Sequence, residues 1–447
     1  MKKVLYFSFL LVGLFATSCS DDDAPLPDNT VNFSATELGI GETETSKSFT
    51  VNIDRKADAA VTISLTTTPK GVSYGTDYTT TPAATNNVLT VTIPAGETSA
   101  TVEVKKVATL FDGDESINFE ISTASAGIVL GSNKSLKLAF GAIISTGSTL
   151  KLEGGEGGAS AINSVFVDFS GNEQTSVARK SWNFGFSTGS DFGVILNNTT
   201  ASTAIEATNQ TLDAAISTAD SVAYAAKLVI GGGEGNFDIV DDVLGDLSKS
   251  VIKEGRVYIV SLGESQSPLY RVKVSKKDAD TYTIQYAKSN ETAVKSLDVA
   301  KNSAYNFVYA SITTDKVVSV QPEKAKWDIE WTRAMYKTGT LPYIFSDFVY
   351  INTKGGVKAA EVLTSTVAYD KYAASNVTST EFSDAVDVIG SKWRSGGGPN
   401  ALPAVKTDRF YVIKDASDNV YKIRFVSMSG GDGGERGYPV VEYALIK

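Results

Sequence analysis

The chain has 447 residues, a formal net charge of -10 and no histidine. This acidic balance repels polyanions, so we expect no nucleic-acid partner. The absence of histidine excludes Ser-His-Asp, Cys-His and histidine-based zinc chemistry. A carboxylate pair of the glycosidase type would remain, but no pattern among the 51 acidic residues identifies one. The composition therefore predicts a protein that is not an enzyme.

Residues 1–18 have the pattern of a signal peptide. Lys2 and Lys3 precede an apolar stretch over residues 4–15, and small residues lead into Cys19, the only cysteine of the chain. The apolar stretch is too short to span a bilayer, which takes about 20 residues. We therefore expect cleavage before Cys19 and lipidation of that residue. The alternative is an ordinary secretory signal with an incidental cysteine.

Residues 19–31 form an acidic leader, because Ser20 is followed by three aspartates. This run resembles the sorting tag of Bacteroidetes-type lipoproteins that are carried to the outer face of the outer membrane. The resemblance implies a surface-exposed protein that is held in the outer membrane by a lipid anchor on Cys19. The alternative is a merely solvated leader.

Residues 32–144 show the alternation of a β-sandwich. Leu89, Val91 and Ile93 alternate with threonines, and this period of two predicts half-buried antiparallel strands. Turn residues at 94–96 and 112–114, without any helical periodicity, favour two packed sheets.

Four segments of this sandwich resemble the Calx-β type of domain, namely residues 48–54, 74–78, 93–96 and 114–119. Calcium-binding members of that family place an acidic run before an Asp-Glu pair. Here residues 107–109 read Val-Ala-Thr, which leaves only Asp77 and the pair Asp114-Glu115. Because Ca²⁺ takes about six to eight oxygen ligands, we expect a spacer or adhesion module and consider calcium unlikely.

Residues 145–160 are rich in glycine and poor in apolar residues. Such a composition predicts a flexible linker and a domain boundary near residue 150.

The remainder contains an internal repeat, with copy one at 161–295 and copy two at 301–447. The segment that begins at Trp182 matches the one at Trp327, and the segments that begin at Phe237 and Arg256 match those at Phe382 and Arg409, in the same order and at nearly one spacing. Copy two carries two insertions, one from residue 335 to 345 and one around residues 396–399. Since binding residues lie preferentially on loops, these insertions are the predicted place of function.

Both copies read as β-branched and aromatic strands, including residues 327–331, 348–352, 409–414, 421–426 and 440–446. A short helix is expected at 379–389, with an equivalent at 237–244. The fold class is therefore all-β: an N-terminal β-sandwich followed by two mostly-β domains.

The order of a Trp-Asp strand at Trp327, the segment 393–406, the strand at Arg409, the strand 418–425 and a final strand resembles the HmuY family of haem-binding lipoproteins. Copy two matches over its whole length and copy one more faintly. The resemblance implies two tandem HmuY-like domains, a cradle-shaped all-β fold, and haem or a related tetrapyrrole as ligand.

Members of that family ligate iron through histidine or methionine, and this chain lacks histidine. Methionine is the remaining neutral axial donor for haem, so Met335 and Met428 are the candidate ligands; the alternative is that each fills a core gap. Tyr336, Tyr343 and Trp393 are candidates for stacking on a tetrapyrrole, and Arg333 for pairing with its propionates. Each of these is equally compatible with a structural role.

Two functions remain open. The first is capture of haem, free or from a haemoprotein, without histidine ligation. The second is a structural or adhesive surface lipoprotein that binds a glycan or protein partner, with the haem site lost.

Overall fold

The computed structural model describes residues 28–41, 44–108, 115–140, 145–231, 233–264, 268–398 and 401–446. The predicted signal peptide, Cys19, the leader up to residue 27 and Asp114 lie outside these ranges. The chain divides into two compact units, residues 1–143 and 144–447. Strands dominate both units, which confirms the all-β fold class.

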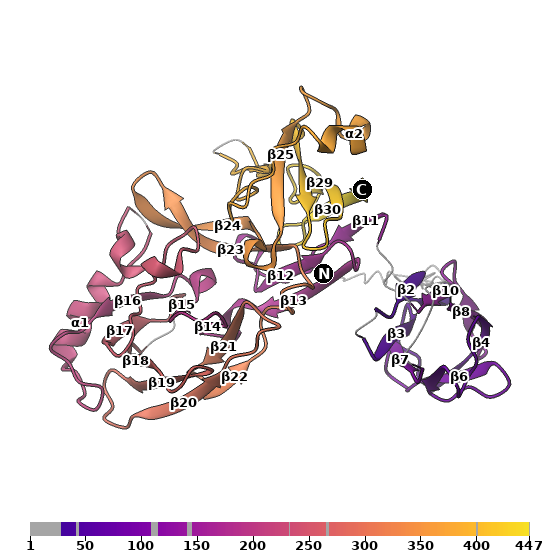
Figure 1. Ribbon diagram of the computed structural model, residues 1–447, viewed down its shortest axis with the longest axis horizontal. Coiled ribbons are helices and arrows are strands. Elements are labelled where there is room, and N and C mark those ends of the chain that lie inside the picture. The colour runs from indigo at the N-terminus through magenta and orange to yellow at the C-terminus, as the bar shows by residue number, and fades with distance from the viewer. Residues whose placement is uncertain are drawn as a thin grey trace, which may run out of the picture. The chain divides into compact units, whose positions relative to one another are not determined.

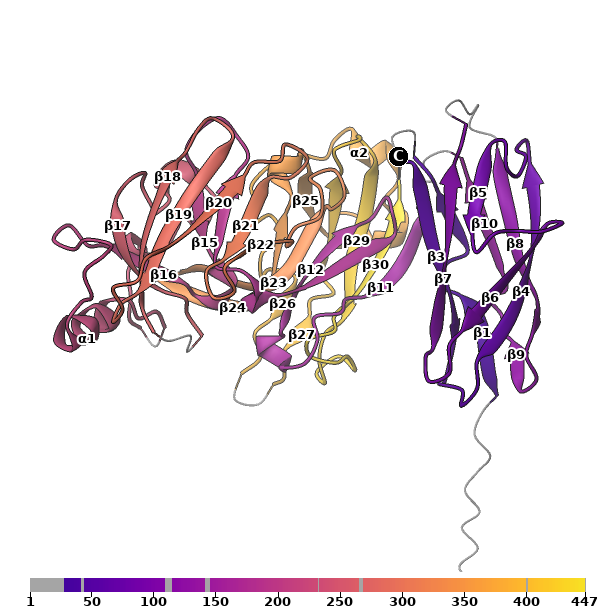
Figure 2. The ribbon, with the colours of Figure 1, turned by 90° about the horizontal axis from the view of Figure 1, so that it is seen from below.

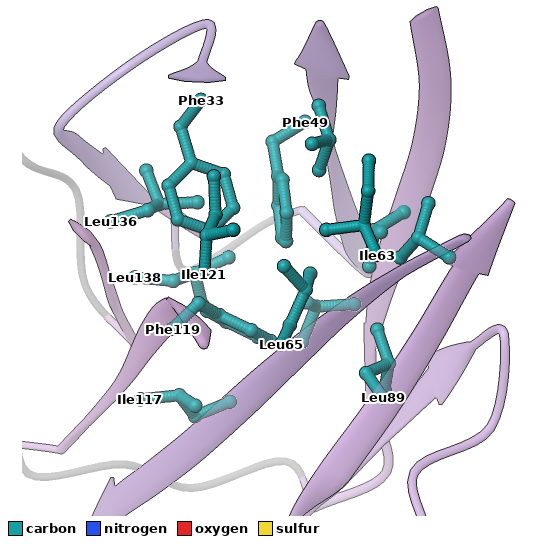
Figure 3. Close-up of a cluster of buried hydrophobic side chains, with 14 of the residues drawn as sticks. Phe33, Phe49, Ile63, Leu65, Leu89, Ile117, Phe119, Ile121, Leu136 and Leu138 are labelled. Carbon is teal, nitrogen blue, oxygen red and sulfur yellow. The ribbon is translucent and has the colours of Figure 1, made fainter. Parts of the chain in front are cut away.

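The first unit is a sandwich of two five-stranded sheets (Figure 1). In spatial order, one sheet contains β5 (Tyr78–Thr81), β7 (Ser99–Lys106), β3 (Ser46–Ile53), β1 (Asn29–Phe33) and β9 (Ile128–Leu130), and the other contains β2 (Glu37–Gly39), β10 (Ser135–Ala139), β8 (Ser116–Ala124), β4 (Val61–Lys70) and β6 (Val88–Ile93). Along β6 the residues alternate between exposed and buried, as the sequence predicts. Figure 3 shows Phe49, Leu65 and Phe119 among the side chains that gather in the core of this unit.

The second unit contains four larger sheets and one short two-stranded ribbon (Figures 1 and 2). We name each sheet after one of its strands. The β18 sheet contains β16 (Thr203–Glu206), β17 (Val257–Ser261), β18 (Tyr270–Lys276), β19 (Thr281–Lys288) and β20 (Lys295–Ala300); the β21 sheet contains β15 (Val194–Leu196), β14 (Phe184–Ser187), β21 (Phe307–Ser311) and β22 (Lys316–Val318); the β23 sheet contains β13 (Glu173–Ala178), β12 (Asn163–Asp168), β23 (Ile329–Thr338) and β24 (Leu341–Ile351); the β29 sheet contains β11 (Gly147–Lys151), β30 (Val440–Leu445), β29 (Val420–Ser427), β28 (Arg409–Lys414) and β25 (Lys358–Leu363); the ribbon contains β26 (Arg394–Ser395) and β27 (Ala404–Val405).

The β21 and β23 sheets each combine strands from both predicted copies. β12 and β13 of copy one pair with β23 and β24 of copy two, while β14 and β15 of copy one pair with β21 and β22 of copy two. The predicted boundary between the copies therefore lies inside one compact unit. The segments predicted as two copies are interlocked halves of this unit. They do not form the two successive domains that the sequence predicts.

Two buried asparagines occupy equivalent places in the two halves. Asn197 Nδ2 donates a hydrogen bond to the carbonyl oxygen of Trp182 at 2.8 Å, and Asn352 Nδ2 donates one to that of Trp327 at 2.9 Å. Each asparagine also donates to a second backbone carbonyl and accepts from a backbone N–H. The same side chain therefore closes the same kind of hairpin in each half, which supports the internal repeat without establishing two tandem copies.

The glycine-rich stretch after residue 145 is packed into the second unit. Its strand β11 pairs with β30, and Leu152 is fully buried. A Cβ placed on Gly154 would overlap the ring of Trp331 and the carbonyl oxygen of Gly437. The prediction of a flexible linker is therefore corrected: at Gly154 a side chain is excluded by close approach of neighbouring groups.

The two α-helices among the described residues lie elsewhere than the sequence predicts. They are α1 (Thr218–Lys227), capped by the Ser217 hydroxyl, and the single turn α2 (Ala374–Val377). The segment 379–389 is not helical, because the backbone of Ser383 forms two hydrogen bonds with that of Ala359. The segment 237–244 contains only a 3₁₀ turn. Neither described helix has the length and apolar character of a membrane span.

Candidate ligand-binding cleft

A cleft with a cavity volume of about 190 Å³ lies where the β21 and β23 sheets meet. Figure 2 shows strands of these two sheets side by side. Six aromatic residues from both halves line it: Phe166, Trp182, Phe307, Tyr309, Trp327 and Tyr350. We call it the aromatic cleft.

One wall is a row of side chains across the β23 sheet. Glu330 on β23 is directly opposite Phe166 on β12 and directly opposite Tyr350 on β24. Directly opposed residues of antiparallel strands project from the same face of the sheet. The register therefore sets a carboxyl group between two aromatic rings.

The other wall comes from the β21 sheet, where Gly185 is directly opposite both Ile195 and Tyr309. A Cβ added to Gly185 would lie 2.7 Å from Ile195 Cγ1 and 3.0 Å from Tyr309 Cε1. The missing side chain thus allows these two groups to close over the strand. Gly185 matches Glu330 in the repeat, so Glu330 has no acidic counterpart at the equivalent position of the β21 sheet.

Two edge-to-face aromatic pairs join the halves beside the cleft. Trp182 of the first half packs against Tyr309 of the second, with ring centroids 4.8 Å apart and an interplanar angle of 74°. Trp327 of the second half packs against Phe166 of the first, at 5.2 Å and 80°. Such pairs favour this T-shaped arrangement, so each half fixes the tryptophan of the other.

Burial dominates the electrostatics of the aromatic cleft. It raises the pKa of Glu330 from its ordinary value of 4.5 to about 7, and only the Ser164 hydroxyl acts in the opposite direction. Burial also raises the pKa values of Tyr309 and Tyr350, with the nearby Glu330 carboxylate as the next cause. The Glu330 carboxyl therefore lies close to two phenol groups in a poorly solvated place.

A loop of the first half forms the rim. Asp241 accepts hydrogen bonds from the backbone N–H groups of Leu196 at 2.6 Å and Val251 at 2.9 Å, and burial raises its pKa to about 6. Asp242 accepts from the N–H groups of Leu244 and Asp246. These two carboxylates thus hold the rim loop in shape.

The structure does not bring Met335 and Met428 together. Both are buried, but Met335 packs in a cluster with Ile239 and Ile259 and also lines the aromatic cleft, whereas Met428 packs in a separate cluster with Trp393. An axial pair around one iron requires both sulfurs to face a common site. The described residues therefore do not fit a haem ligated by this pair.

The predicted stacking residues are also divided between different places. Tyr336 and Tyr343 are directly opposite each other in the β23–β24 hairpin, where Tyr336 donates a hydrogen bond to Asp387 and Tyr343 is exposed. Trp393 is buried, stacks on Phe425 with centroids 3.9 Å apart, and donates to the carbonyl oxygen of Asp347. Trp393 is thus a core residue.

Arg333 has a partner within the protein. Its Nη1 lies 2.6 Å from Glu264 Oε1, and the same oxygen receives Nη1 of the buried Arg179, also at 2.6 Å. These two guanidinium groups, together with Lys180, act against burial and hold the pKa of Glu264 below its usual range. Arg333 therefore belongs to a structural ion-pair cluster.

Of the residues predicted to bind a ligand, only Met335 lines the aromatic cleft, and Glu330 and the six aromatic residues were not predicted. In the sequence, Glu330 is part of the segment at Trp327 that reveals the internal repeat. Tyr309 and Tyr350 do not differ there from other aromatic residues of β-strands. One signal was available: Glu330 stands between Ile329 and Trp331 at the position where the matching strand has Gly185. Among the described residues, no group of three or more Cys, Asp or Glu side chains is arranged to hold a metal ion.

The fold and the cleft together define an all-β protein with a small, aromatic-walled cleft formed by two interlocked halves. The family model described as HmuY protein matches residues 160–443, which is more than half of the chain and spans both halves as one stretch. The chain therefore belongs to the HmuY family.

Solved structures show only low similarity. The apo form of the Calx CBD1 domain has 14% sequence identity and a TM-score of 0.22, covering 26% of this chain and 97% of that one. The chaperone DraB of E. coli has 12% identity and a TM-score of 0.18, covering 37% of this chain and 80% of that one. No curated protein matches the chain. Likeness at this level carries no conclusion, and the resemblance of the first unit to Calx-β stays a prediction.

Proposed function

We propose that this protein is a non-enzymatic surface lipoprotein of the HmuY family that captures a small ligand in the aromatic cleft without coordinating a metal. The observation that carries the proposal is the cleft itself: six aromatic rings and the carboxyl group of Glu330, whose pKa burial raises, line it from both halves. A concave apolar site with a few polar groups and a perturbed pKa is the usual form of a ligand site.

The size of the aromatic cleft supports a small ligand. Pockets for drug-sized molecules enclose roughly 300–1,000 Å³, and an engineered apolar cavity of about 150 Å³ binds benzene. At about 190 Å³, the cleft matches a ligand head of one ring or similar size. A tetrapyrrole, with four pyrrole rings and acidic side chains, exceeds this volume and would face Glu330, Asp241 and Asp242.

The test is a ligand screen on the unlipidated chain, residues 20–447, together with a variant whose new side chain fills the cleft. Leu244 lines the cleft and its side chain is 47% exposed, so Leu244→Trp should block the site without disturbing the core. Leu363→Trp is the matched control, because Leu363 is 42% exposed and lies on β25 outside the cleft.

Calorimetry of amines, monosaccharides, small aromatic compounds and haemin should find at least one ligand whose binding is lost in Leu244→Trp and kept in Leu363→Trp. If every compound that binds does so equally to both variants, the cleft is not the capture site. Saturable haemin binding that is lost only in Leu244→Trp would instead restore haem capture as the function.

A further inference from the structure

Glu330 differs from the other acidic groups of the aromatic cleft. Asp241 and Asp242 each accept two backbone hydrogen bonds from the rim loop and its neighbours. Within the described part of the chain Glu330 has no ion pair, and no neighbouring cation favours its ionised form. Glu330 is half-buried, and a carboxylate that is partly shielded from water without a counter-ion is unfavourable, so a cationic ligand would gain most at this position.

The aromatic rings around Glu330 would also attract a cation, independently of the carboxyl group. Aromatic faces attract ammonium groups through their quadrupole, most strongly where water is excluded. The lining already contains one such contact, since the Lys354 Nζ lies 5.9 Å from the centroid of the Phe307 ring. Lys354 itself is exposed at the surface, and among the described residues no lysine or arginine lies over the rings of Phe166 or Tyr350 beside Glu330.

Other ligand classes fit these groups less well. A neutral ring would bury the Glu330 carboxyl further without neutralising it. An anion would be repelled by Glu330 and by the two aspartates of the rim. The combination of a carboxyl group on one wall and aromatic rings on both therefore selects positive charge.

We propose that the aromatic cleft recognises the charged head of a small organic cation, an amine or quaternary ammonium group, with Glu330 as its counter-ion and the surrounding aromatic rings as its walls. This inference rests on the proposed function and specifies the ligand class for the same site. Glu330 would touch the ligand directly, whereas Ile195 and Tyr309, which close over Gly185, would form the opposite wall.

The experiment compares choline with its neutral carbon isostere, 3,3-dimethylbutan-1-ol, which has the same shape without the charge. Binding to residues 20–447 is measured by calorimetry at pH 8, where the Glu330 carboxyl is mostly ionised. Glu330→Gln keeps the shape of the side chain and removes its charge. Glu381→Gln makes the same change at an exposed residue outside the cleft and is the matched control.

We expect choline to bind at least tenfold more tightly than the isostere, Glu330→Gln to abolish this preference, and Glu381→Gln to keep it. Leu244→Trp should remove binding of both compounds. Equal binding of the two compounds to the unmodified chain would overturn the cation inference while leaving capture in the cleft intact. Binding of neither would overturn it as well, and the proposed function would then depend on the wider screen alone. The comparison on the unmodified chain decides the matter even if Glu330→Gln fails to fold.

Discussion

Substitution of the two equivalent asparagines tests whether the halves of the second unit fold as one. Asn352 is almost fully buried and makes four hydrogen bonds: it donates to the carbonyl oxygens of Lys324 and Trp327, and it accepts from Gly355 N and Asn306 Nδ2. Asn197 is likewise buried and makes four bonds, all within the first half.

The expected loss in the free energy of unfolding follows from the number of these hydrogen bonds. A net contribution of about 1 kcal/mol for each hydrogen bond, and somewhat more where a buried partner is left unsatisfied, gives a loss of about 3–5 kcal/mol for either Asn197→Ala or Asn352→Ala. Asn290→Ala, at an exposed residue without such bonds, should change the free energy of unfolding by less than about 0.5 kcal/mol.

Guanidinium unfolding followed by tryptophan emission is the assay, because the four tryptophans of the chain all lie in the second unit. Trp182 reports on the first half and the other three on the second. Since the β21 and β23 sheets interlock the halves, both variants should lower the midpoint of one shared transition by similar amounts. Two separate transitions, each moved by only one of the substitutions, would show that the halves are independent domains.

Three further predictions concern the second unit. Because the pKa of Glu330 is raised in the folded protein, folding binds a proton between about pH 4.5 and 7. The free energy of unfolding should therefore fall as the pH rises from about 4.5 through 7. Glu330→Gln should flatten this part of the pH profile, measured by chemical denaturation. Gly154→Ala should cost about 1–3 kcal/mol of stability through overpacking, whereas Gly398→Ala, with open space around it, should cost little. Met335→Leu and Met428→Leu should each cost less than about 1.5 kcal/mol and leave the haemin absorbance spectrum unchanged. A spectral change in one variant would show that this methionine contacts haemin, and equal changes in both would contradict their placement in separate clusters.

Local patterns in the sequence predicted the last three strands closely, whereas the strands predicted at 327–331 and 348–352 cover only parts of β23 and β24. The strand predicted at 409–414 is β28, the one at 421–426 is one residue shorter than β29 at each end, and the one at 440–446 is one residue longer than β30. The reason is local chemistry. Asp415 accepts hydrogen bonds from the N–H groups of Ser417 and Asn419, which ends one strand and begins the next within a few residues.

The aromatic cleft could not be predicted in the same way. Its walls depend on which strands pair, and β12 pairs with β23 across more than a hundred intervening residues. Alternation in one strand indicates which side chains share a face, but it does not select the partner strand. The same limit explains why the candidate site residues do not meet. Met335 and Trp393 were predicted from residue type and loop length, whereas the neighbours of each are set by strands that are distant in the sequence.

The pairing of β11 with β30 has a consequence for the order of events in assembly. Gly147 lies directly opposite Ala444, so the first strand of the second unit finds its partner only in the last strand of the chain. Closing so long a loop delays productive folding. During synthesis or export, the second unit would stay incomplete until its final residues emerge, and loss of the last strand would leave two sheet edges open to pairing with other chains.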